Sequence, residues 1–170
     1  PDANAVLCKI LKDINQEPMV RHEAAEALGA IGSQESINIL NEYKNDPVIE
    51  VAETCELALE RINWLKTSTD NKLGKSAYNS VDPAPPAVNR DVAELERILT
   101  NESESLFERY RAMFALRNLR NPKALEALGL ALQCGSALFR HEIAFVLGQI
   151  QDESSVKYLK QSLEDTDENE

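Results

Sequence analysis

One pattern constrains the fold of this chain more than any other. Apolar residues recur every three or four positions along nearly its whole length, as in Val20, Ala24 and Leu28, and again in Phe139 and Ile143. This spacing places apolar side chains on one face of an α-helix. The sequence contains no alternating apolar and polar run and no hairpin signature. An all-α fold is therefore predicted.

The helical pattern is also repeated. Residues 21–31 begin with Arg-His-Glu and align with residues 140–150, which begin in the same way. Residues 51–56 and 109–116 are weaker copies, each about 30 residues from one of the first two. A two-helix unit of this length is typical of an α-solenoid, in which stacked neighbours bury the apolar face that one unit leaves open. We predict a superhelix of antiparallel helix pairs.

Residues 67–89 interrupt the repeats. The segment is polar and then proline-rich, and its Pro-Pro pair at 85–86 forbids a continuing helix. It is interpreted as a linker between the end of one repeat block, residues 1–66, and the start of a second, residues 90–170. The linker is either a simple spacer or a segment that sets how the blocks face each other or contributes to a partner surface.

Charge narrows the classes of partner. The chain has 170 residues, and its 18 Lys and Arg against 29 Asp and Glu give a net charge of −11. Binding to nucleic acid or to an anionic membrane is therefore not expected, and a cationic partner is favoured. Cys8, Cys55 and Cys134 are far apart and odd in number, which predicts three buried free thiols in a reducing, cytoplasmic compartment.

The two histidines of the chain carry the chemical signal. Both occur in Arg-His-Glu at the same repeat position, where the other copies have Ala52 and Tyr110, so packing does not require histidine there. Imidazole with carboxylate suits non-haem iron, and also manganese or zinc. The predicted metal ligands are His22, Glu23, His141 and Glu142.

A simpler interpretation remains open. The histidines could be polar residues of a first helical turn, with the glutamates beside them complementing the helix dipole. Glu26, one turn after His22, is either an outer hydrogen-bond acceptor for a ligand or a solvated side chain, and the second is favoured. No Ser-His-Asp set or H-E-x-x-H motif is present.

Several segments resemble the deoxyhypusine hydroxylase family. They include Met-Val-Arg-His-Glu at 19–23, Ser-Val-Asp-Pro-Ala-Pro-Pro at 80–86 and Phe-Arg-His-Glu at 139–142. The resemblance covers nearly the whole chain, linker included. It implies a HEAT-like solenoid with two halves and four His-Glu motifs that hold two iron ions.

The resemblance also implies a reaction. Members of this family use dioxygen to hydroxylate the deoxyhypusine residue of translation initiation factor five A, which completes hypusine. By analogy, His22 and Glu23 serve one iron and His141 and Glu142 the other, with no catalytic residues beyond these ligands. A polyamine-like substrate suits an acidic enzyme.

The chain departs from the family pattern because it has two His-Glu pairs and not four. It looks like an internal fragment, which we expect to fold as a solenoid but to lack a complete di-iron site and to be inactive alone. The alternative function is a non-catalytic HEAT scaffold that binds a protein. A chromophore-attaching HEAT protein is a third possibility, but it gives no reason for the twin motifs.

Overall fold

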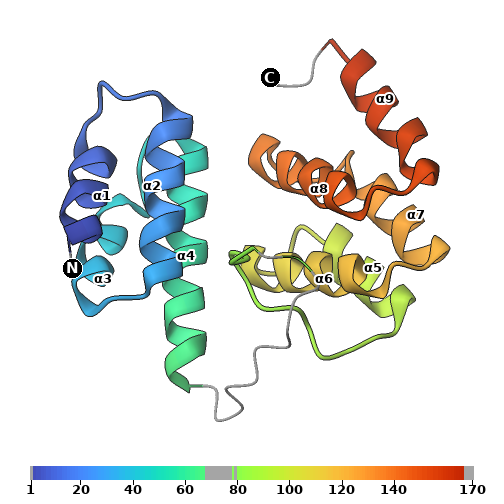
Figure 1. Ribbon diagram of the computed structural model, residues 1–170, viewed down its shortest axis with the longest axis horizontal. Coiled ribbons are helices and arrows are strands. Elements are labelled where there is room, and N and C mark those ends of the chain that lie inside the picture. Colours follow the sequence, from blue (N-terminus) through green and yellow to red (C-terminus); the bar gives the residue numbers. More distant parts are fainter. Residues whose placement is uncertain (1, 68–77, 79, 167–170) are drawn as a thin grey trace. The chain divides into compact units, whose positions relative to one another are not determined.

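The computed structural model describes residues 2–67, 78 and 80–166, and all regular elements in these residues are helices. They form two units, one with residues 2–67 and 81–84 and the other with residues 78, 80 and 85–166. The helices are α1 (Asp2–Lys12), α2 (Pro18–Ile31), α3 (Gln34–Tyr43), α4 (Ile49–Thr67), α5 (Val92–Thr100), α6 (Leu106–Leu119), α7 (Pro122–Ala131), α8 (Ala137–Ile150), the 3-10 turn η1 (Glu153–Ser155) and α9 (Val156–Glu164). The predicted all-α fold class is confirmed (Figure 1).

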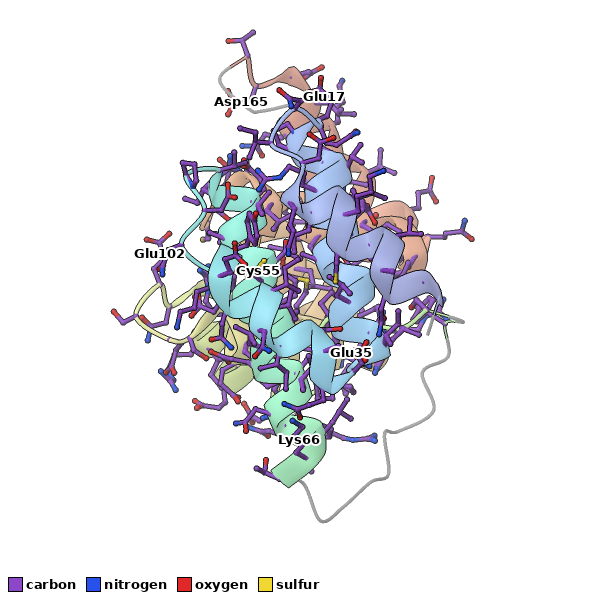
Figure 2. All side chains as sticks on the ribbon, turned by 90° about the vertical axis from the view of Figure 1, so that its left-hand side faces the viewer. Glu17, Glu35, Cys55, Lys66, Glu102 and Asp165 are labelled. Carbon is purple, nitrogen blue, oxygen red and sulfur yellow. The ribbon has the colours of Figure 1, made fainter. Side chains whose placement is uncertain are left out.

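In the first unit, α1 packs against α2, α3 packs against α4, and α2 runs along α4 (Figure 1). Gly29 makes that last contact close, because a Cβ atom built on it would lie 2.6 Å from the Cβ of Ala58. Cys55 lies among the helices, whereas Glu35 and Lys66 project at the surface (Figure 2). The core consists of Leu11, Ala24, Ala25, Leu28, Ile39, Leu40, Val51, Cys55, Ala58 and Ile62.

In the second unit, α5 packs against α6 and α7 against α8, and α6 contacts α7 and α8 as well. Its interior is aromatic. The ring of Tyr110 lies 6.2 Å from that of Phe114 and 5.6 Å from that of Phe139, measured between centroids. All three side chains are almost completely buried.

A buried arginine marks the same place in both units. Arg21 Nε donates to the carbonyl oxygen of Leu11 at 3.0 Å, and Arg109 Nε donates to that of Leu99 at 2.9 Å. In each unit the arginine lies on the second helix of a pair, and it binds the end of the first helix ten residues earlier. Equivalent contacts at equivalent sequence positions support the predicted two-helix repeat.

Residues that favour helix ends lie where several helices end and begin. Gly32 ends α2 in the left-handed conformation, with φ 66°, and its N–H donates to the Leu28 carbonyl. Asn121 and Ser136 begin α7 and α8, where their side-chain oxygens accept backbone N–H groups of the first turn. Local sequence therefore sets these helix boundaries.

Part of the predicted linker, residues 68–77 and 79, lies outside the described residues. Within the first unit, Ala84 is fully buried and the Asp82 carbonyl accepts a hydrogen bond from Arg61 Nε at 3.2 Å. Within the second unit, the Ala87 N–H donates to the Arg111 carbonyl at 2.9 Å. The described part of the segment is thus packed onto helices. The block boundaries at 66–67 and 89–90 stay a prediction.

The expectation of three buried thiols is wrong for two of them. Cys55 is completely buried, and this burial, together with the Asp46 carboxylate, raises its pKa to about 12 despite the nearby Arg21. Cys8 on α1 packs against the core of the first unit but is only half-buried, and Cys134 in the turn after α7 is half-buried as well. Among the described residues, no helix combines the length and the hydropathy needed to cross a bilayer.

Candidate metal site

His22 lies in the second turn of α2 and is buried, with 5% of its surface exposed. Its Nδ1 lies 2.7 Å from Thr54 Oγ1, and the Thr54 hydroxyl in turn donates to the Glu50 carbonyl, also at 2.7 Å. A hydroxyl has one proton to donate. Both contacts are therefore satisfied only when Nδ1 carries a proton, and in the neutral ring the lone pair is then on Nε2.

The lone pair of Nε2 faces a carboxylate. Glu23 Oε1 lies 3.8 Å from His22 Nε2, and the Glu23 side chain is largely exposed. Glu26 brings a third donor, and one ligand atom from each of these residues lies within 4.8 Å of the other two. The three residues follow the spacing H-E-x-x-E, in which the first and last positions are one helical turn apart and share a face.

Glu26 is half-buried, so the favoured expectation that it is solvated is not supported. Burial raises its pKa to about 7, and the charges of Glu23 and Asp82 act in the same direction while Arg61 opposes them. Arg61 itself is buried and donates to the carbonyls of Gly29 and Asp82. Burial lowers its pKa, and the two nearby carboxylates counteract this.

A shallow pocket of the first unit adjoins this cluster. It is lined by Glu26, Thr54, Arg61 and Asp82, with apolar residues of α2 and α4 between them. The carboxylates on its rim outnumber the cations, since Arg61 is the one basic residue of the lining. The local field therefore favours a cation over an anion.

The second pair has a different environment. His141 and Glu142 lie in the second turn of α8, where His141 is exposed and Glu142 half-buried. One turn later, at the position that corresponds to Glu26, α8 carries Phe145, whose exposed fraction is 51%. Among the described residues, no third donor joins His141 and Glu142.

The helix-dipole interpretation does not fit these positions. Neither α2 nor α8 has an acidic residue in its first turn, because Glu23 and Glu142 lie beyond it. The effect of the dipole is confined to the terminal turn. Thr54 is a functional candidate that sequence reasoning missed, because it comes from the next helix pair, 32 residues after His22.

Three comparisons with known proteins agree. A family model described as HEAT repeats matches residues 1–60 and 92–170. The chain is 58% identical to deoxyhypusine hydroxylase of Danio rerio over 94% of its own length and 53% of that protein. It is 55% identical to the Homo sapiens deoxyhypusine hydroxylase over 99% of its length and 56% of that protein.

A solved structure of human deoxyhypusine hydroxylase in complex with glycerol also matches. It superimposes with a TM-score of 0.92 and 54% identity, covering 99% of this chain and 58% of the human one. The chain thus spans about half the length of the curated relatives it matches. The chain belongs to the HEAT-repeat family, and the relatives named above are deoxyhypusine hydroxylases.

Proposed function

We propose that the protein to which these residues belong is a deoxyhypusine monooxygenase of the cytoplasm. Its substrate would be the deoxyhypusine residue of translation initiation factor five A, which it would hydroxylate to hypusine. The observation that carries the proposal is identity above half with deoxyhypusine hydroxylases across nearly the entire chain.

The proposed metal ligands are His22, Glu23, His141 and Glu142. The donor chemistry fits iron, because imidazole and carboxylate together are the ligands of non-haem iron sites. The Thr54 contact fits as well, since metal-bound histidines almost always donate their other ring N–H to an oxygen acceptor. Two iron ions per intact protein would supply the activation of dioxygen.

The residues of this chain would orient a metal ligand and attract a cationic substrate. Thr54 fixes the plane and the tautomer of the His22 ring. The carboxylates of Glu26 and Asp82 lower the electrostatic potential of the pocket beside it, and the net charge of −11 extends the same preference over the molecule. A substrate side chain with protonated amines is attracted to such a surface, and an acidic competitor is repelled.

The test is hydroxylation itself. The chain would be expressed alone and also as a chimera in which the zebrafish relative supplies the rest of the relatives' length. Each protein would be loaded with ferrous iron and incubated with deoxyhypusine-containing factor in air, and the mass of the product would be measured. We expect the chimera to add one oxygen atom and the chain alone, with two His-Glu pairs, to add none.

His22→Ala and His141→Ala in the chimera identify the ligands. Each is expected to abolish hydroxylation and to reduce the iron content. A chimera that binds the factor equally well with and without both histidines, and hydroxylates nothing, would instead support the non-catalytic scaffold.

A further inference from the structure

The two His-Glu pairs differ in their number of donors, and Glu26 is the difference. On α2 the sequence reads His-Glu-Ala-Ala-Glu, whereas on α8 it reads His-Glu-Ile-Ala-Phe. Glu26 lies one helical turn after His22 and therefore on the same side of α2. Its carboxylate is within 4.8 Å of donor atoms of both His22 and Glu23.

The arrangement of the imidazole points to a cation. The Thr54 network places a proton of His22 on Nδ1, so in the neutral ring the lone pair belongs to Nε2, which lies 3.8 Å from Glu23 Oε1. A metal ion held by these two atoms would have one imidazole nitrogen and one carboxylate oxygen as ligands. A buried imidazole held in this tautomer by an oxygen acceptor is the usual arrangement of a metal-binding histidine.

The distances fit after a small adjustment. Donors at ordinary metal–ligand lengths of about 2.0–2.2 Å lie about 3 Å from one another. The present spacing of at most 4.8 Å closes to that value through side-chain rotation, since Glu23 is largely exposed and free of tight packing. One nitrogen and two carboxylates suit manganese, ferrous iron or zinc.

We propose that Glu26 is a third protein ligand, beside His22 and Glu23, for one divalent transition-metal ion in the first unit. The inference rests on the proposed function in taking His22 and Glu23 as ligands. It adds a residue to that set and makes the two pairs unequal, since the pair on α8 has no third donor among the described residues.

Manganese is the probe, because free Mn²⁺ gives an electron paramagnetic resonance signal that disappears on binding and the ion does not oxidise in air at neutral pH. The chain would be titrated with Mn²⁺, alongside Glu26→Gln, His22→Ala and the control Glu56→Gln, an exposed carboxylate on α4. We expect one bound ion per wild-type chain, affinity at least tenfold lower for Glu26→Gln, no binding for His22→Ala and no change for Glu56→Gln.

Glutamine keeps the shape of Glu26, and circular dichroism with the fluorescence of Trp64 in α4 checks that each variant is folded. Unchanged affinity in Glu26→Gln beside loss of binding in His22→Ala would overturn the inference and leave the proposed function intact. Absence of binding in the wild type would likewise overturn it, and hydroxylation by the chimera would decide the proposed function separately.

Discussion

The two units of this molecule use one repeat position for opposite purposes. Arg21 and Arg109 make the same backbone contact in their respective units, so the residues after them, His22 and Tyr110, occupy equivalent places. Tyr110 is 2% exposed and packs against aromatic rings, whereas His22 is equally enclosed but bonded to a hydroxyl. The repeat supplies a buried position. The residue at that position, together with its partner in the next helix pair, decides whether the position is part of the apolar core or a candidate functional site.

The arginines themselves show the same divergence. Arg21 is paired with the buried carboxylate of Asp46, and both side chains are less than 5% exposed. Arg109 has its guanidinium 4.0 Å above the ring of Phe139. Arg21 also lies over a ring, 5.6 Å from the centroid of Tyr43. The first unit therefore holds its arginine with a buried ion pair and a longer ring contact and the second with a closer ring contact, so the two should respond differently to the same kind of substitution.

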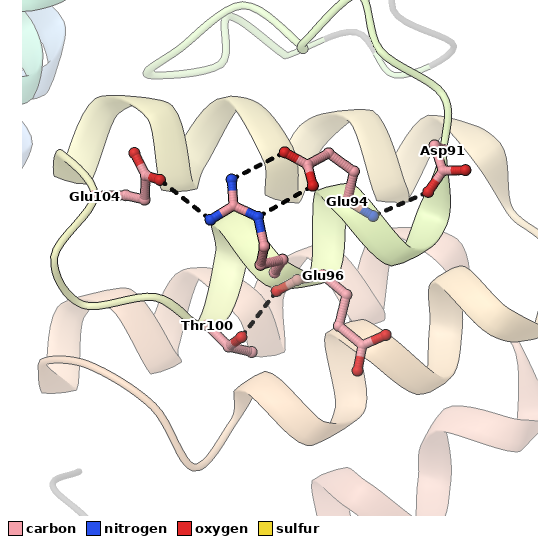
Figure 3. A network of polar contacts seen from close by, with 6 residues as sticks. Asp91, Glu94, Glu96, Thr100 and Glu104 are labelled. Carbon is pink, nitrogen blue, oxygen red and sulfur yellow. Dashed lines mark hydrogen bonds and ion pairs between the residues drawn. The ribbon is translucent and has the colours of Figure 1, made fainter.

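The largest expected effect is in the first unit. Asp46→Ala leaves the Arg21 charge buried without its carboxylate, which should cost about 3–5 kcal/mol of stability. Urea unfolding followed by Trp64 fluorescence reports on this unit, because Trp64 is the one tryptophan of the chain. The matched control removes an exposed pair of the second unit: Glu94→Gln, next to Arg97 (Figure 3), should leave that transition where it is. A small effect of Asp46→Ala would contradict the contrast between the units.

The stability that Asp46 contributes to the first unit also depends on pH. Burial acts to raise its pKa, but the hydrogen bonds from Arg21 and from the Val48 N–H, with the Arg21 charge, hold the pKa below the ordinary value of 3.8. The stability from this group is present above that value and is lost as the pH falls through the lower pKa of the folded chain. The Asp46→Ala penalty should therefore shrink in acid.

The second effect concerns the imidazole. Thr54→Val removes the oxygen that accepts from His22 Nδ1, so the ring loses its fixed tautomer, and Mn²⁺ affinity should fall about 10–100-fold. Thr54→Ser keeps the hydroxyl and should retain most of the affinity. The same titration checks both variants, and equal affinities for valine and serine would show that the hydroxyl does not matter.

The third predicted effect is a gain in stability of the metal-free chain. The pKa of Glu26 is about 7 in the folded chain against an ordinary value of 4.5, so the folded state holds this proton more tightly and loses stability as the pH rises between these values. Glu26→Gln should therefore stabilise the metal-free chain by about 1–2 kcal/mol at pH 8 and have little effect at pH 4. Urea unfolding at both pH values in the presence of a chelator measures this.

Glu56→Gln, an exposed change on α4, is the control for the same experiment. A destabilised Glu26→Gln at pH 8 would mean that the carboxylate is satisfied in the metal-free chain. A residue that weakens the metal-free protein and strengthens the metal-bound one is typical of a binding site.

The smallest effect concerns helix starts. Ser136 accepts the Phe139 N–H at the start of α8, and Ser136→Ala should cost about 1 kcal/mol. The start of α2 has no such bond, since Glu17 precedes Pro18 and its side chain caps nothing. Glu17→Ser should then gain a few tenths of a kcal/mol, up to about 1. Circular dichroism measures the unfolding of Ser136→Ala, and Trp64 fluorescence measures that of Glu17→Ser. A loss of stability in Glu17→Ser would show that α2 needs no cap.

Much of the fold could be predicted from the sequence because its signals are local. The period of apolar residues indicated helices, and the structure places Gly32, Asn121 and Ser136, residue types that favour helix ends, where helices end or begin. The repeat of Arg-His-Glu singled out four candidate ligands. The burial of Cys8 and Cys134 could not be predicted in the same way, since it depends on how many neighbouring helices cover each position.

The sequence by itself determined that this chain folds as stacked helix pairs and that its histidines are special, because periodicity, breakers and repeats are properties of neighbouring residues. Only the tertiary structure decided how differently the two Arg-His-Glu copies are surrounded. Thr54 reaches His22 from the next helix pair, and burial makes Glu26 more than a solvated charge. Hydrogen bonds and desolvation act between residues that are far apart along the chain, so the same tripeptide becomes an enclosed cluster of donors on α2 and an open pair on α8.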